Sequence, residues 1–385
     1  MKIHTVASGE TLYDIARLYG VNPAKIIENN TLYSPDRLCV GQKLLILTPT
    51  RTYTVRGGDK IDDIARRFAL PERCILRRNP ALSEKRGIYP MQVIALRYDI
   101  PQNRSILYNG YYYKGCPDGA LNFALSFASH ITICAYKATR DGILSLYDDR
   151  GIIEKVSLQR AFPIMRIYIK TDGSPSTEWL KTIKEEITDI AKKKEYRGVC
   201  LAFKTSVMNE ELNNFIFDMR RELMGADKLL FLECDGGCNK AREFCDGAIL
   251  RYEKCNLEEI PSFDNGEKEF YTEDSENNDA SITFMDFSPF ALTKSASLMI
   301  SDAIADAYRV AGELKYDKEK MICYYNTKRY RTKTNNTLVA FPSLENIKAK
   351  LELITQRGYM GISFDIFRSP IEWLLMSLSL FDSQS

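Results

Sequence analysis

The chain has 385 residues, of which 45% are hydrophobic and 27% charged, a composition typical of a globular protein with room for two or three domains. Its 53 basic and 51 acidic residues leave a formal net charge of +2, so no nucleic-acid partner is expected. No stretch approaches the roughly 20 apolar residues of a membrane span, so no membrane partner is expected either.

The N-terminus enters a folded pattern at once, without an apolar run suited to a secretory signal, which predicts synthesis and first residence in the cytoplasm. Ten cysteines in such a chain predict reduced thiols rather than disulfides. Cys234, Cys238, Cys245 and Cys255 cluster, but no second close pair of Cys or His completes a tetrahedral zinc site. Buried thiols are favoured over a metal there, and no metal and no cofactor is expected.

The first hundred residues contain a repeat. The segment from Gly9 to Arg17 (GETLYDIAR) recurs 49 positions later as GDKIDDIAR. Thr11 suits the start of one helix and Pro23 the start of a second, and a short apolar strand flanks each pair of helices. Each unit is therefore predicted as strand, helix, helix, strand, over residues 1–49 and 50–99.

These units resemble the LysM motif, whose members bind N-acetylglucosamine chains of peptidoglycan or chitin. The resemblance rests on the Gly-Glu-Thr-Leu, Ile-Ala, Asn-Asn and Val-Gly-Gln segments of the first unit and their counterparts in the second. It implies a sugar groove between two loops, formed in the first unit by Gly9, Glu10, Thr11 and Leu12 facing Asn30, Thr31, Leu32 and Tyr33. In the second unit the matching residues are Gly58, Asp59, Ile61, Asn79, Ala81 and Leu82.

The second unit departs from the motif after Leu82. Residues 83–87 are added there, and Tyr-Pro-Met-Gln at 89–92 stands where the first unit has Val-Gly-Gln. Its competence to bind sugar is accordingly less well supported. For both units the alternative is a spacer that has lost sugar binding.

Residues 105–385 alternate short apolar runs with helix-length segments, which predicts an α/β fold with a parallel sheet. Their length suits one (β/α)8 barrel, the TIM barrel. The eight expected strands are 106–112, 131–136, 163–169, 199–203, 229–233, 247–251, 321–325 and 361–366. The clearest expected helices are 177–195, 210–224, 294–312, 344–357 and 371–380. The polar, acidic segment between Glu253 and Phe290 is expected to be a long loop over the barrel mouth.

The strand at 199–203 and the helix after it resemble the fourth strand and helix of glycoside hydrolase family 18. In that family the strand carries acidic residues at alternate positions and ends in a Glu that protonates the glycosidic oxygen. The matching positions here are Cys200, Ala202 and Lys204. A Lys does not replace the acid, because its usual pKa is about 10.4 and its ammonium disfavours an oxocarbenium-like transition state. The resemblance therefore implies a barrel without ordinary family 18 hydrolysis.

Other residues at the expected barrel mouth are mixed in their fit to the family. Tyr252 matches a Tyr that positions the N-acetyl group, whereas Asp365 stands where the family has a Trp under the sugar. The candidates for a polar cleft are Lys204, Glu233, Asp235, Tyr252, Glu253 and Asp365. A charged Lys204 predicts a carboxylate beside it. A structural ion pair filling an inactive cleft is favoured over a new polar pocket, and a Schiff-base role for Lys204 is disfavoured because acidic neighbours do not lower its pKa.

Two LysM-like units followed by such a barrel resemble bacterial spore-cortex N-acetylglucosaminidases. Three functions stay open. The first is a non-hydrolytic protein that binds peptidoglycan or another N-acetylglucosamine polymer in the spore cortex, coat or cell wall. The second is a glycoside hydrolase with relocated carboxylates at Glu233, Asp235, Glu253 or Asp365. The third is a structural protein of spore-coat assembly, with coat proteins as partners.

Overall fold

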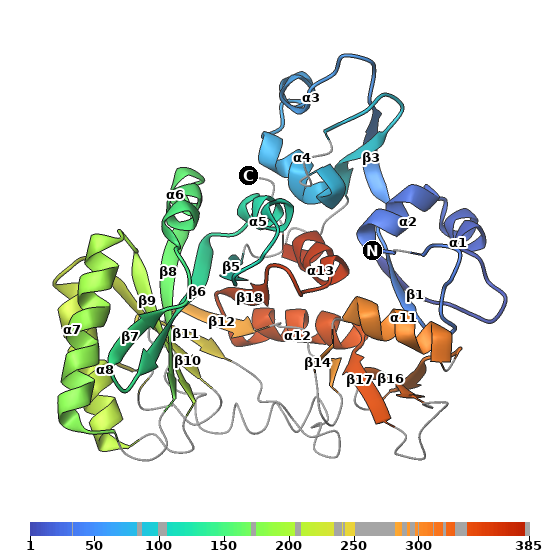
Figure 1. Cartoon of the computed structure of the whole chain (residues 1–385). Helices are drawn as coiled ribbons and strands as arrows, with labels where there is room; N and C mark the ends of the chain where they lie inside the picture. Colours follow the sequence, from blue (N-terminus) through green and yellow to red (C-terminus); the bar gives the residue numbers. More distant parts are fainter. Residues whose placement is uncertain are drawn as a thin grey trace.

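The computed structural model, shown in Figure 1, describes most of the chain. The residues outside the description are 33, 83–86, 99–105, 171–174, 205–208, 235–240, 242, 251–281, 287–290, 293–296, 299, 311, 319–320, 328–336 and 382–385. The described chain forms two small N-terminal repeats, a barrel and a sheet inserted into the barrel. None of its described helices has the length and apolarity to cross a bilayer.

The first repeat has the predicted order of elements. β1 (Lys2–Thr5) pairs antiparallel with β2 (Lys43–Ile46), and α1 (Leu12–Tyr19) and α2 (Pro23–Asn29) lie between them in the chain. At the start of α1 the Thr11 hydroxyl accepts from the Asp14 amide, while the Asp14 carboxylate accepts from the Thr11 amide. This reciprocal cap fixes where the helix begins, as the sequence predicts.

The second repeat follows the same plan. Its elements are β3 (Pro49–Thr54), α3 (Ile61–Phe68), α4 (Glu72–Arg78), the short 3-10 turn η1 (Pro80–Leu82) and β4 (Val93–Tyr98). β3 and β4 pair antiparallel. Each repeat has its own small apolar core, built on the helix face that the three-to-four spacing predicts. The expected duplication of a strand, two helices and a strand is thus confirmed.

The barrel is a closed ring of eight parallel strands in the described part of the chain. In ring order these are β5 (Leu107–Tyr112), β6 (His130–Thr139), β8 (Phe162–Lys170), β9 (Gly198–Lys204), β10 (Leu229–Cys234), β11 (Gly247–Leu250), β12 (Ile282–Asp286) and β18 (Gly361–Asp365). Every neighbouring pair is parallel, and β5 pairs with both β6 and β18. The TIM barrel predicted from the sequence is confirmed.

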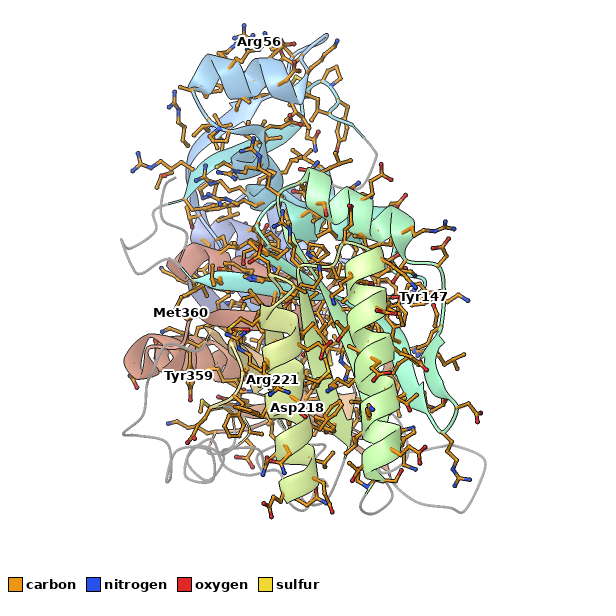
Figure 2. All side chains as sticks on the ribbon, turned by 90° about the vertical axis from the view of Figure 1, so that its left-hand side faces the viewer. Arg56, Tyr147, Asp218, Arg221, Tyr359 and Met360 are labelled. Carbon is orange, nitrogen blue, oxygen red and sulfur yellow. The ribbon has the colours of Figure 1, made fainter. Side chains whose placement is uncertain are left out.

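Helices cover the outside of the ring. They are α5 (Asp118–Leu125), α6 (Arg150–Leu158), α7 (Thr177–Lys193), α8 (Glu210–Met224), α12 (Leu344–Arg357) and α13 (Ile371–Phe381). Figure 2 shows α7 and α8 side by side, with Asp218 and Arg221 on the outer side of α8. β7 (Gly142–Ser145) adds an antiparallel hairpin to β6.

Two predictions in the last third of the chain are wrong, one of a barrel strand and one of a loop. The segment predicted as the seventh barrel strand, 321–325, lies in β16 (Ile322–Thr327), which pairs antiparallel with β17 (Thr337–Pro342) outside the ring. Cys323 and Tyr325 are buried while Tyr324 is partly exposed, the alternation of a half-buried antiparallel strand. The seventh barrel strand is instead β12, a five-residue strand within the segment predicted to be a loop.

An insertion between β12 and β18 completes the fold. Its five-stranded sheet contains β13 (Ala291–Leu292), β14 (Ser297–Leu298) and β15 (Lys315–Asp317) besides β16 and β17. Its helix α11 (Ile300–Val310) is shorter than the predicted helix 294–312, because that segment also holds β14.

The first repeat packs tightly on this insertion (Figure 1). Val40 and Glu313 form a parallel β-bridge, and the Leu314 amide donates to the Val40 carbonyl over 2.7 Å. Gly41 has φ +83°, and a Cβ added there would lie 2.1 Å from the Leu314 carbonyl oxygen. Lys43 adds an ion pair to Glu345 at 2.9 Å. Glycine at position 41 is therefore required both by the backbone and by the close approach of the insertion.

Candidate functional sites in the repeats and the barrel

The carboxylates predicted for the sugar grooves hold their own loops together. The Glu10 carboxylate accepts from the Ala7 amide at 2.8 Å and lies 3.0 Å from His4 Nε2. In the second repeat the Asp59 carboxylate accepts from the Tyr53 hydroxyl at 2.7 Å and from the Arg56 amide at 2.8 Å.

These contacts lower both carboxyl pKa values. For Glu10 the main cause is the Ala7 amide, followed by the His4 contact. For Asp59 it is the Tyr53 hydroxyl, followed by the Arg56 amide. Both acids therefore stay ionised near neutral pH and fix the loop after the first strand of their repeat.

Two asparagines of the predicted grooves, one in each repeat, make equivalent hydrogen bonds within their repeats. The Asn30 amide donates to the carbonyls of Ile26 and Leu45 and accepts from the Leu45 amide. Asn79 makes the corresponding three bonds, to Ile75 and Ala95. Because these side chains tie the second helix to the last strand, they have few groups left for a sugar.

The remaining groove residues keep accessible backbone or apolar surface. Gly9 and Gly58 lie at φ +78° and +86° in open surroundings, and Thr11 is exposed. Leu12 and Leu82 are buried, whereas Thr31, Leu32, Ile61 and Ala81 are partly exposed. Leu32 packs on the core that contains Leu12, and Ile61 packs on the core that contains Leu82. Each pair of predicted loops thus meets at one small core, which fits contacts through backbone amides and methyl-accepting side chains.

In the barrel, the family 18 positions lie on β9. Cys200 is fully buried in a cluster with Phe231, Ile249 and other side chains from six strands, so it points into the ring. Ala202 is two residues further along and therefore on the same face, with 2% of its surface exposed. Lys204 is the last residue of β9 and pairs in register with Lys170, but its side chain lies outside the described part.

The interior beside these small residues holds a charged pair that the sequence analysis does not identify. Arg166 on β8 donates from Nε and Nη2 to the two Glu233 oxygens on β10, both at 2.7 Å. The two side chains are 9% and 4% exposed. In the strand register, Arg166 on β8 lies beside Cys200 on β9, and Glu233 on β10 lies beside Ala202 on β9. The ion pair therefore crosses β9 at two small side chains.

The surroundings keep this pair charged. Burial disfavours the guanidinium charge, but attraction and hydrogen bonding to Glu233 outweigh it and raise the pKa of Arg166. The Tyr111 hydroxyl donates to Glu233 over 3.3 Å. A carboxylate held this way is stabilised in its ionised form, the wrong form for a proton donor.

Asp365 ends β18 and organises the turn that follows. Its Oδ1 accepts from the amides of Phe367 and Arg368, each at 2.9 Å, and its side chain is buried. The other cleft candidates, Asp235, Tyr252 and Glu253, lie outside the described residues, as does Tyr33 of the first repeat.

The sequence does carry a signal for Arg166. It is a single charge in the middle of a buried apolar strand, and such charges are almost always paired internally. The four clustered cysteines stay untested, since only the Cys245 side chain is described. Within the described residues no group of three or more His, Cys, Asp or Glu is arranged to hold a metal.

Comparison with known proteins agrees with this architecture. Residues 4–47 and 53–97 each match the family model of the LysM domain. The spore cortex-lytic enzyme SleL of Bacillus megaterium superposes with a TM-score of 0.72 at 18% identity, over 98% of this chain and 97% of that one. A chitinase from Chromobacterium violaceum superposes on 71% of the chain with a TM-score of 0.57 at 11% identity, covering 99% of that chitinase.

Two curated proteins of Bacillus subtilis are similar in sequence. YdhD, named as a sporulation-specific glycosylase, is 27% identical over 249 residues, which is 60% of this chain and 57% of YdhD. The cell wall-binding protein YocH is 40% identical over 68 residues, 17% of this chain and 23% of YocH. The chain therefore spans little more than half the length of YdhD and about a quarter of YocH.

The chain is thus a protein with two N-terminal LysM domains and a barrel of the chitinase fold. Among the structures named above, SleL shares the whole arrangement, repeats included, over nearly its full length.

Proposed function

We propose that the chain binds a glycan containing N-acetylglucosamine, such as peptidoglycan, through its LysM domains, and that its barrel does not hydrolyse it by the family 18 route. The LysM matches and the similarity to YocH support the first part. Similarity to SleL and YdhD supports a place in the spore cortex, coat or cell wall.

The observation that carries the second part is the described interior of the barrel. Lys204 stands at the family position of the proton donor, Cys200 and Ala202 occupy two further positions that would be acidic, and Glu233, in register with Ala202, is engaged by Arg166. Family 18 hydrolysis needs an acid that can give a proton to the leaving oxygen. Neither a small side chain nor a carboxylate bound by a guanidinium supplies one.

The test is to incubate the full chain with purified peptidoglycan and with isolated spore cortex. The protein should sediment with both, and the supernatant should contain no more reducing ends than a buffer control. Efficient release of reducing ends would refute the non-hydrolytic assignment. Failure to sediment with either polymer would refute glycan binding.

A hydrolase with relocated carboxylates is the second candidate, favoured by the full-length similarity to a cortex-lytic enzyme. It requires one carboxylate among Glu233, Asp235, Glu253 and Asp365 to act on the substrate. Single amide replacements, such as Glu233→Gln, should then abolish a measurable release of product. Activity that survives all four replacements would dismiss this candidate.

A further inference from the structure

A cavity of about 810 Å³ lies where the first repeat, the insertion and the barrel meet. Its walls are the loop between α2 and β2, the start of α5, one face of α11, and the turn from β18 to α13. This volume is within the roughly 300–1,000 Å³ of small-molecule sites. Asn30, Thr31 and Leu32 line it, and these are also residues of the predicted sugar groove. A glycan in that groove would therefore pass the cavity.

The cavity contains polar atoms that lack partners among the described residues. Ser369 is 8% exposed, and its hydroxyl makes no hydrogen bond there. The Thr31 hydroxyl and one Glu372 oxygen are also buried and make no hydrogen bond with a described residue. Buried polar groups are rarely left unsatisfied in folded proteins. A ligand with hydroxyl and acetamido groups would supply the missing partners.

The charges around the cavity favour an anion. Arg37, Arg309 and Arg368 line it, and Glu372 is the one acidic residue among the described lining. Burial raises the pKa of Glu372 to about 8, so near neutral pH this side chain is largely protonated and can donate a hydrogen bond. Apolar surface completes the walls, from Leu38, Phe123, Ile304 and Leu374 among others.

We propose that this cavity binds a peptide-free N-acetylmuramic acid unit of a peptidoglycan strand, whose lactyl carboxylate is not joined to a peptide. The inference rests on the proposed glycan binding and adds a specificity to it. The arginines would hold the sugar carboxylate, Ser369 and Glu372 would bond to hydroxyl or acetamido groups, and the apolar wall would accept a methyl group. Arg309 and Arg368 already lie 3.4 Å from Asp306 and 3.9 Å from Asp365, so a sugar carboxylate would add a second anion to each, which a neutral chitin fragment would not.

The experiment compares two peptide-free tetrasaccharides on the full chain by titration calorimetry. One alternates N-acetylglucosamine and N-acetylmuramic acid, and the other is neutral chitotetraose. The acidic ligand should bind at least roughly tenfold more tightly, and added salt should reduce that difference. Arg309→Gln should weaken the acidic ligand by roughly tenfold and leave the neutral one unchanged.

Two further variants separate the cavity from general effects. Ala305 is exposed on α11 and lines the cavity, so Ala305→Trp should obstruct it and remove the preference without disturbing the core. Arg221→Gln on α8 removes an exposed arginine on the other side of the barrel from the first repeat, and should change neither affinity (Figures 1 and 2). Circular dichroism of each variant checks that it is folded.

The outcomes distinguish the two proposals. Equal affinity for the two tetrasaccharides, unchanged by Ala305→Trp, would overturn the cavity site while glycan binding stands. Equal loss of both ligands in Ala305→Trp would overturn the specificity for the acidic sugar. Binding of neither tetrasaccharide, together with failure to sediment with peptidoglycan, would overturn both proposals.

Discussion

Replacing Arg166 by Met tests the charged pair inside the barrel. The guanidinium makes two 2.7 Å hydrogen bonds to Glu233, and both side chains are at least nine-tenths buried. The variant removes the guanidinium that both Glu233 oxygens accept from and leaves this buried carboxylate with the Tyr111 hydroxyl among its remaining contacts. Breaking a buried pair from one side typically costs about 3–5 kcal/mol, so we expect a loss of that size. This is a large part of the roughly 5–15 kcal/mol that stabilises a typical domain.

The double variant, Arg166→Met with Glu233→Leu, is the internal control. It removes both charges and replaces them with apolar side chains of similar size, so its stability should lie close to that of the wild type. Urea unfolding of all four members of the cycle gives the coupling energy. Both tryptophans, Trp179 on α7 and Trp373 on α13, lie in helices of the barrel, so their fluorescence follows barrel unfolding.

Two outcomes would contradict this interpretation of the ion pair. If Arg166→Met loses less than about 1 kcal/mol, Glu233 is not held as a buried charge. If the double variant is as unstable as Arg166→Met, the cost comes from packing around position 166 rather than from the broken ion pair with Glu233.

Three further predictions concern single residues. Burial raises the pKa of Glu372 from 4.5 to about 8. Between these two pH values the folded state keeps a proton that the unfolded state releases, so the free energy of unfolding falls as pH rises from 4.5 to about 8. Glu372→Gln should therefore stabilise the chain by up to about 5 kcal/mol at pH 9, because each pH unit between the two pKa values is worth about 1.4 kcal/mol, and by little at pH 4 in urea unfolding; an equal effect at both would contradict the shift. Asn79→Ala should lower the free energy of unfolding by about 2–4 kcal/mol. It removes three hydrogen bonds within the second repeat and an acceptor 2.9 Å from the buried Lys25 ammonium. A loss below about 0.5 kcal/mol in thermal unfolding would show that the amide is dispensable. Gly41→Ala should lower the melting temperature more than Gly20→Ala. Both positions have positive φ, but only at Gly41 would the new Cβ meet the insertion. Equal shifts in melting temperature would mean that this contact is not tight in solution.

The repeats could be predicted from the sequence because local signals determine them. Thr11 with Asp14 fixes the start of α1, Gly20 ends it in the left-handed conformation, and Pro23 occupies the first turn of α2. Each signal acts within a few residues, so no knowledge of distant contacts is needed. The family resemblance then predicts which loops would face a sugar.

The barrel could be predicted less completely because its last strands depend on distant partners. β12 is a five-residue strand whose place in the ring is set by pairing with β11 and β18. β16 has a similar length and a similar share of apolar residues, yet it pairs with β17 in the insertion. Length and hydrophobicity do not separate these two strands; only the partner does. The cavity at Ser369 is beyond prediction for the same reason, since its walls come from segments far apart in the chain.

The loss of acidic residues on β9 and the presence of the Arg166–Glu233 pair are best understood as one change. Arg166 neighbours position 200 and Glu233 neighbours position 202, so the pair occupies the space above two small side chains. Carboxylates at 200 and 202 would join Glu233 in the same buried volume, and a single guanidinium cannot balance three negative charges in a medium of low dielectric constant. Two acids at these positions would therefore be disfavoured by the described neighbours on β8 and β10. Under the proposed function, we expect that family 18 chemistry would require the charges on β8 and β10 to change together with those on β9.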